Sequence, residues 1–206
     1  MKLVVISPEA EDPREVAVLG ALLRAGLERY HVRKPAWGSD QLGAWLEALP
    51  AAWRPRLVLH SHHHWVGALG LGGRHWRDEA ATPTAPGEGY TSRSCHDLAG
   101  LTAALGAYTA VFFGPIFPSL SKPGHGPGGT ETAGTLTRTL ADCSPLQRQT
   151  AVIALGGVTL ERLPHCRDLG YDGAAVLGAV WQSAQPVAAF QALQAAAAAM
   201  PAPVLI

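Results

Sequence analysis

The chain has 206 residues, enough to bury a sizeable core in one large domain or two small ones. Hydrophobic residues make up 48% and charged residues 16%, with 16 Lys and Arg balancing 16 Asp and Glu. This composition excludes a disordered chain, and it lacks the basic excess that is typical of a nucleic-acid-binding protein. A local cationic site for a small anion remains compatible with it.

Short apolar runs alternate with longer segments of helical period, a pattern typical of βα units around a parallel sheet. The predicted strands are residues 3–6, 30–32, 57–59, 73–76, 90–92, 110–113, 151–154 and 173–177. The predicted helices are residues 14–24, 40–49, 65–69, 97–105, 132–141, 160–168 and 186–199. Eight such strands favour a compact (β/α)8 TIM barrel, a single domain over residues 1–206. The alternative is a doubly wound open sheet, although no G-x-G-x-x-G motif follows the first strand.

Targeting signals and disulfides are not indicated. Cys95, Cys143 and Cys166 are odd in number and show no C-x-x-C spacing, which argues against a disulfide framework or a cysteine zinc site. The apolar start is too short for a signal peptide, and the Ala-rich C-terminal segment is shorter than the roughly 20 apolar residues of a membrane span. We therefore expect a cytoplasmic protein without a membrane partner.

In a barrel, the residues that end the strands face one mouth, where barrel enzymes build their active sites. Several of these residues are cationic or can donate hydrogen bonds, and four are glycines: Arg33, Lys34, His60, His75, Ser94, Gly114, Pro115, Gly156, Gly157 and Gly178. Glycine turns after the seventh and eighth strands expose backbone N–H groups, so a phosphate ligand is the first inference. The simpler alternatives are a tight turn at the two adjacent glycines and an ordinary surface pair of Arg33 and Lys34.

A run of histidines after the third strand raises the alternative of a transition-metal site, because imidazole is a common metal ligand. The run consists of His60, His62, His63 and His64. Side chains at successive positions of a turn diverge, and no fixed carboxylate partner is evident. We therefore predict that this run does not hold a metal ion.

Several segments match, in order, the pattern of the thiamine phosphate synthase and TenI superfamily. The most specific is GPIFPSLSK at 114–122, which is close to that family's Gly-Pro-Ile-Phe-Pro-Thr-x-Thr-Lys loop. Other matching segments are YHVRK at 30–34, GRH at 73–75, TSRSCH at 91–96, ALGGV at 154–158 and GAAVLG at 173–178. Together these segments make the chain resemble this superfamily over most of its length.

The resemblance implies a (β/α)8 barrel that acts on phosphorylated thiamine precursors. In the synthase reaction, hydroxymethylpyrimidine diphosphate loses pyrophosphate with the help of Mg2+, and the nitrogen of thiazole phosphate captures the resulting cation. The resemblance assigns the diphosphate to cations and hydroxyls, namely Arg33, Lys34, Lys122, Ser119 and Ser121, with Ser94 near the pyrimidine. It assigns the phosphate of the thiazole to Gly156, Gly157 and Gly178.

The chain departs from the family at the magnesium site. Ser61 and Ala80 stand where the synthase has its two aspartates, so Asp78 and Glu79 are the nearest candidate ligands. This departure keeps two alternatives open: a TenI-like thiazole tautomerase and a non-catalytic binder of thiazole phosphate. In the tautomerase His60 or His125 would carry the proton, because the family's histidine after the sixth strand is Pro115 here. The sequence leaves monomer and homodimer open.

Overall fold

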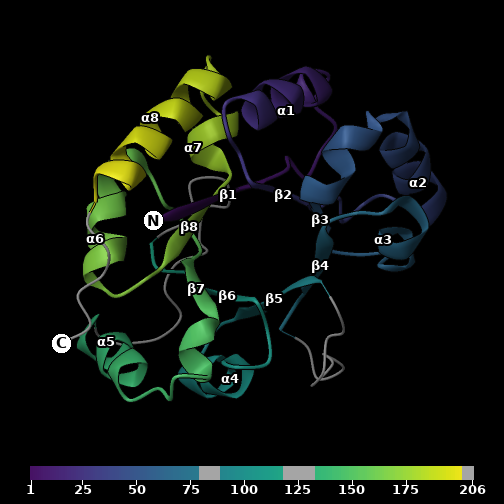
Figure 1. Cartoon of the computed structure of the whole chain (residues 1–206). Coiled ribbons are helices and arrows are strands. Elements are labelled where there is room, and N and C mark those ends of the chain that lie inside the picture. Colours follow the sequence, from purple (N-terminus) through teal and green to yellow (C-terminus); the bar gives the residue numbers. More distant parts are fainter. Residues whose placement is uncertain (79–88, 118–132, 201–206) are drawn as a thin grey trace.

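The computed structural model describes residues 1–78, 89–117 and 133–200. Its parallel strands pair in sequence order and close into a barrel, because β1 pairs with both β2 and β8 (Figure 1). The strands are β1 (Lys2–Ile6), β2 (Arg29–Val32), β3 (Leu57–Leu59), β4 (Gly73–Trp76), β5 (Tyr90–Cys95), β6 (Ala110–Phe113), β7 (Ala151–Ala154) and β8 (Gly173–Val176). This closure confirms the predicted (β/α)8 barrel and excludes the open sheet.

Helices follow most of the strands and surround the barrel (Figure 1). They are α1 (Glu15–Arg24), α2 (Ser39–Ala48), α3 (His64–Leu69), α4 (Leu98–Ala104), α5 (Ala133–Ala141), α6 (Leu163–Asp168), α7 (Gly178–Trp181) and α8 (Pro186–Ala199). The described part of the chain also contains the 3-10 segments η1 (Ala51–Arg56), η2 (Gln147–Gln149) and η3 (Leu160–Arg162). The sequence prediction missed α7 because four residues are too few to show a helical period.

The core has two layers, as the alternation of side chains along the strands requires. Alternate residues of the strands fill the inside of the barrel, among them Val4, Ile6, Ala110, Phe112, Ile153 and Ala175. The residues between them face outward toward the helices, so that Tyr30 of β2 shares a buried cluster with Leu19 and Leu22 of α1. All strands run in one direction, so their carboxyl ends, and the loops that follow, meet at one mouth of the barrel.

No helix in the described part of the chain is both long enough and apolar enough to span a membrane.

Candidate functional site at the carboxyl end of the barrel

The barrel gathers the predicted strand-end residues at one mouth. Arg33 directly follows β2, His60 directly follows β3, and Ser94 is the penultimate residue of β5. Gly156 and Gly157 come just after β7, and Gly178 begins α7 after β8. Five further predicted site residues lie outside the described residues: Glu79, Ser119, Ser121, Lys122 and His125.

Arg33 offers a cation at this mouth. Its guanidinium pairs with Glu9, and its side chain keeps 27% of its surface exposed. Ser7, which directly follows β1, holds the backbone of Arg33. Its Oγ accepts a hydrogen bond from Arg33 N at 2.8 Å and donates one to Arg33 O at 3.1 Å. A dianionic or trianionic phosphate group would compete with the single carboxylate of Glu9 for this guanidinium, because it carries more negative charge and can bind the planar guanidinium in the same bidentate way.

Lys34 does not share this role. Its ammonium group is fully buried and donates to Glu15 Oε2 at 2.5 Å, Pro8 O at 2.7 Å and Ala10 O at 3.3 Å. Glu15 also accepts a hydrogen bond from Tyr30 Oη at 2.8 Å. The prediction that Lys34 neutralises a diphosphate is therefore not supported, because its charge is already satisfied behind the mouth, between β2 and α1. Sequence reasoning did not single out Glu15, which is 15 residues from Tyr30 along the chain.

The two glycines after β7 form a tight turn joined to the loop after β6. Gly156 has φ of 95° and Gly157 has φ of 62°, a region that favours glycine. A Cβ on Gly156 would lie 2.7 Å from Pro115 Cβ, and Ile116 N donates to Leu155 O at 2.9 Å. The tight-turn alternative is thus realised in the fold, and both glycines of the turn remain partly exposed.

Arg162 is a cation beside this turn that sequence reasoning missed. It lies in η3, donates from Nη1 to Gly157 O at 2.7 Å, and places its guanidinium over the Phe117 ring at 4.8 Å from the centroid. The sequence could have pointed to Arg162, because it lies only five residues after Gly157. Its positive charge adds to the attraction of the turn for an anion.

The run of histidines diverges, as predicted. His62 Nε2 contacts Trp37 O at 3.2 Å, His63 Nε2 contacts Leu59 O at 3.1 Å, and His64 Nε2 contacts Ser39 Oγ at 3.1 Å. These three rings turn away to separate partners outside the barrel. Only His60 belongs with the groups inside the barrel.

Inside the barrel, His60 meets two histidines from neighbouring strands, His31 of β2 and His75 of β4. His31 Nδ1 lies 3.1 Å from His60 Nε2, and the rings of His60 and His75 stack with centroids 4.0 Å apart. Burial lowers the pKa of His31 and His60 well below the usual value, and it lowers the pKa of His75 to about 3. All three imidazoles are therefore neutral at pH 7.

Two serines hold His75 in place. His75 Nδ1 is 2.9 Å from Ser92 Oγ, and His75 Nε2 is 2.9 Å from Ser94 Oγ. Ser92 Oγ also reaches Arg74 O at 3.4 Å, which favours the tautomer in which His75 Nδ1 donates to Ser92 and Nε2 accepts from Ser94. Sequence reasoning missed His31 and Ser92, although each lies two residues before a named site residue and so shares its face of the strand.

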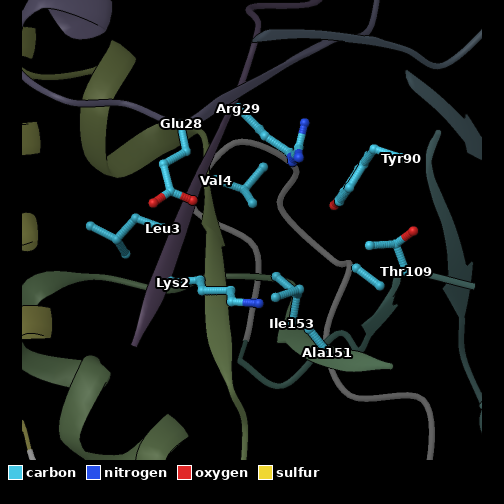
Figure 2. Close-up of a pocket in the computed structure, with 10 residues that line it drawn as sticks. Lys2, Leu3, Val4, Glu28, Arg29, Tyr90, Thr109, Ala151 and Ile153 are labelled. Carbon is cyan, nitrogen blue, oxygen red and sulfur yellow. The ribbon is translucent and has the colours of Figure 1, made fainter. Parts of the chain in front are cut away.

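A pocket at the opposite end of the barrel is separate from this mouth. Figure 2 shows Lys2, Arg29, Tyr90 and Ala151 around it, and these residues begin β1, β2, β5 and β7. The guanidinium of Arg29 lies over the Tyr90 ring at 4.1 Å from the centroid. In barrels of this kind the amino end of the strands is associated with stability rather than catalysis, so we place the candidate site at the other end.

A closed parallel barrel with cationic, hydroxyl and glycine positions at the carboxyl ends of its strands has the organisation of a (β/α)8-barrel enzyme. The sequence profile of thiamine monophosphate synthase matches residues 3–180, and the chain belongs to this family of transferases. The family binds thiazole and pyrimidine phosphates and typically uses Mg2+.

Individual relatives agree with this family. The thiamine-phosphate synthase of Bordetella pertussis is 31% identical over 204 residues, which cover 93% of this chain and 92% of that protein. The enzyme of the same name from Methylobacillus flagellatus is 30% identical over 195 residues, 88% of each chain. A crystal structure of thiamine phosphate pyrophosphorylase from Bacteroides thetaiotaomicron superposes with a TM-score of 0.76 at 27% identity, covering 96% of this chain and 98% of that one.

The described residues do not fit the Mg2+ of this family. Asp78, the candidate ligand that the structure describes, is paired with Arg93 at 2.8 Å. Arg93 alternates with Ser92 and Ser94 along β5, so its side chain points away from the inside of the barrel. Ser61 offers only a hydroxyl at the position of the family's first aspartate, and Mg2+ prefers carboxylate and phosphate oxygens.

Proposed function

We propose that this protein joins hydroxymethylpyrimidine diphosphate to thiazole phosphate and releases pyrophosphate. In this reaction the bond between the pyrimidine methylene carbon and the diphosphate oxygen breaks, and its electron pair leaves with pyrophosphate. The thiazole nitrogen then donates its lone pair to the same carbon to form the new C–N bond. Membership of the thiamine monophosphate synthase family over residues 3–180 is the observation that carries the proposal.

The chain's own residues would do three things in this reaction. Arg33 binds the diphosphate and stabilises the charge that develops on the leaving oxygen, and Lys122, which lies outside the described residues, shares this task. The turn at Gly156 and Gly157, together with Gly178 after the neighbouring strand β8, binds the phosphate of the thiazole. Ser94 lies beside the pyrimidine and the diphosphate, and its oxygen is the group it offers as an acceptor, because its hydrogen is donated to His75 Nε2. We expect the reaction to take place in the cytoplasm, in a monomer or a homodimer.

The direct test is release of pyrophosphate by the full-length protein given both substrates. We expect Arg33→Ala to lower kcat/KM by at least about tenfold, because charge-assisted contacts to a phosphate are worth about 1.5–3 kcal/mol. Arg167→Ala is the matched control, since Arg167 is also paired with a neighbouring carboxylate and its side chain is 28% exposed, against 27% for Arg33. Equal activity of the two variants, or no pyrophosphate release by the wild-type protein, would contradict the proposal.

A TenI-like isomerisation of thiazole carboxylate phosphate is the second candidate, and the poor fit to Mg2+ favours it. It needs a group that moves a proton on the thiazole ring, a role that the sequence gives to His60 or His125. Turnover of this compound without divalent metal, and without pyrophosphate release from the synthase substrates, would select it. Binding of thiazole phosphate without turnover of either substrate would indicate a non-catalytic binder.

A further inference from the structure

Three histidines form a compact cluster inside the barrel, close to its mouth. His31, His60 and His75 each offer one ring nitrogen, and these three atoms lie within 4.8 Å of one another. The residues come from β2, from the end of β3 and from β4, three neighbouring strands. The barrel therefore fixes the spacing of their backbone positions, unlike that of the divergent run His62, His63 and His64. We call these three residues the histidine cluster.

His31 has a ring nitrogen without a partner. It is completely buried, and among the described residues no group hydrogen-bonds its Nε2. A neutral imidazole has one N–H donor and one lone pair, so a buried ring with a single contact leaves one of them unsatisfied at a cost of about 1–3 kcal/mol. The cluster is therefore not fully hydrogen-bonded within the described residues, and the nitrogen of His31 that faces His60 is the other one, Nδ1.

His75 has the arrangement of a metal ligand with its supporting partner. In proteins, a histidine that binds a metal through one nitrogen usually donates its other N–H to an oxygen, which fixes the tautomer and the ring. Ser92 Oγ stands 2.9 Å from His75 Nδ1 and fits this partner. The lone pair of Nε2 then faces Ser94 Oγ at the mouth, at 2.9 Å. Ser94 would release this nitrogen to an ion and remain close to it.

The spacing of His31 and His60 also fits a shared ion. Their facing nitrogens are 3.1 Å apart, close to the separation of two nitrogens that each bind one ion at about 2.0–2.1 Å. The stack of His60 on His75 must open for the third nitrogen to join, because nearly parallel rings at 22° do not direct their lone pairs to one point. His60 is the ring that would turn, since it lies beyond the last residue of β3 and is only partly buried.

We infer that the histidine cluster binds a divalent transition-metal ion of the Zn2+ class. Three neutral imidazoles suit Zn2+, Co2+ or Ni2+, whereas Mg2+ prefers oxygen ligands. Two carboxylates were named above, Glu9 and Asp78, and each is paired with an arginine. Three protein ligands leave a fourth position open, as in catalytic zinc sites. The inference does not rest on the proposed reaction, because ion binding itself is the readout.

The test uses the full chain purified without a polyhistidine tag and stripped of metal by a chelator. Metal content by mass spectrometry, calorimetric titration with Zn2+, and the visible absorption of Co2+ measure stoichiometry, affinity and ligand type. We expect one ion per chain, a Co2+ spectrum typical of nitrogen ligands, and an affinity for Zn2+ that Mg2+ in excess does not reduce. Absence of binding, or equal displacement by Mg2+, would overturn the inference.

Variants assign the ion to the cluster. We expect His60→Asn to weaken Zn2+ binding by at least about tenfold, and Ser92→Ala by about 10–100-fold, the range seen for loss of a supporting partner. His64→Asn is the control, since His64 is exposed and contacts Ser39 instead. His60 is only partly buried, so His60→Asn is expected to keep the fold, which circular dichroism checks. Unchanged affinity in a folded His60→Asn, or equal loss in His64→Asn, would place the ion elsewhere and overturn the inference.

Discussion

Replacing Lys34 by methionine is expected to destabilise the protein by about 3–5 kcal/mol, the range for removal of one partner from a buried ion pair. Methionine has a comparable length but no charge, so the change removes three donated hydrogen bonds with little loss of packing volume. The Lys34 side chain is 0% exposed and that of Glu15 is 4% exposed. Water therefore cannot replace the lost ammonium group, and the carboxylate of Glu15 is left with Tyr30 Oη, 2.8 Å away.

The loss is expected to depend on pH. Burial raises the pKa of Glu15, and contact with Lys34 lowers it in part. Without Lys34, the pKa of Glu15 in the folded state rises further above its value in the unfolded state. Between these two pKa values, the folded variant therefore binds more protons than the unfolded variant. Stability of the variant relative to the wild type therefore falls as pH rises through this window and recovers as pH falls through it.

Urea denaturation of both proteins at pH 5 and pH 8 measures this effect, and the deficit of Lys34→Met should be smaller at pH 5. The double variant Lys34→Met with Glu15→Gln removes the stranded charge, so it should recover part of the lost stability at pH 8. A Lys34→Met protein as stable as the wild type, with pyrophosphate release lost, would refute the structural role and return Lys34 to the diphosphate site.

Two further predictions concern the turn after β7 and the thiols. Gly156→Ala should lower the free energy of unfolding by about 1–3 kcal/mol, because φ is 95° at this position. Gly67→Ala, in α3 where a Cβ meets no other atom, should raise the free energy of unfolding by about 0.5–1 kcal/mol. Thermal melts that show the same change for both variants would contradict this. At pH 8, the half-buried Cys143 should react with a thiol reagent before Cys95 and Cys166, because burial raises the pKa of Cys95 to about 12 and of Cys166 to about 11, which leaves little thiolate. Labelling of the native protein, located by peptide mass spectrometry, checks the order, and early modification of Cys95 would count against the burial.

Most strands could be predicted from the sequence because they are short apolar runs between turn signals, although β4 and β5 carry several polar residues. The structure gives Leu57–Leu59, Gly73–Trp76, Ala110–Phe113 and Ala151–Ala154 the predicted bounds. The prediction for β5 stopped at residue 92, whereas the strand continues to Cys95. Arg93 and Ser94 are not apolar, so the hydrophobic pattern ended before the pairing with β6 did.

The site was harder to predict because it depends on contacts between distant segments. The order of strand ends identified Arg33, His60, Ser94 and the glycine turns, since all carboxyl ends of a parallel barrel meet. The order of strand ends could not show that Arg33 and Lys34 have different roles. Consecutive residues point to opposite sides, and the side to which Lys34 points follows only from its ion pair with the buried Glu15 of α1. The contact between His31 and His60, 29 residues apart, likewise requires the register of β2 and β3.

A crystal structure of the protein with thiazole phosphate and pyrophosphate tests the central claim most directly. We predict the phosphate of the thiazole at the turn of Gly156 and Gly157, with pyrophosphate at the guanidinium of Arg33 on the same mouth. Ligands bound instead at the amino end of the strands, between Arg29 and Tyr90 in the pocket of Figure 2, would contradict the assignment of the active site.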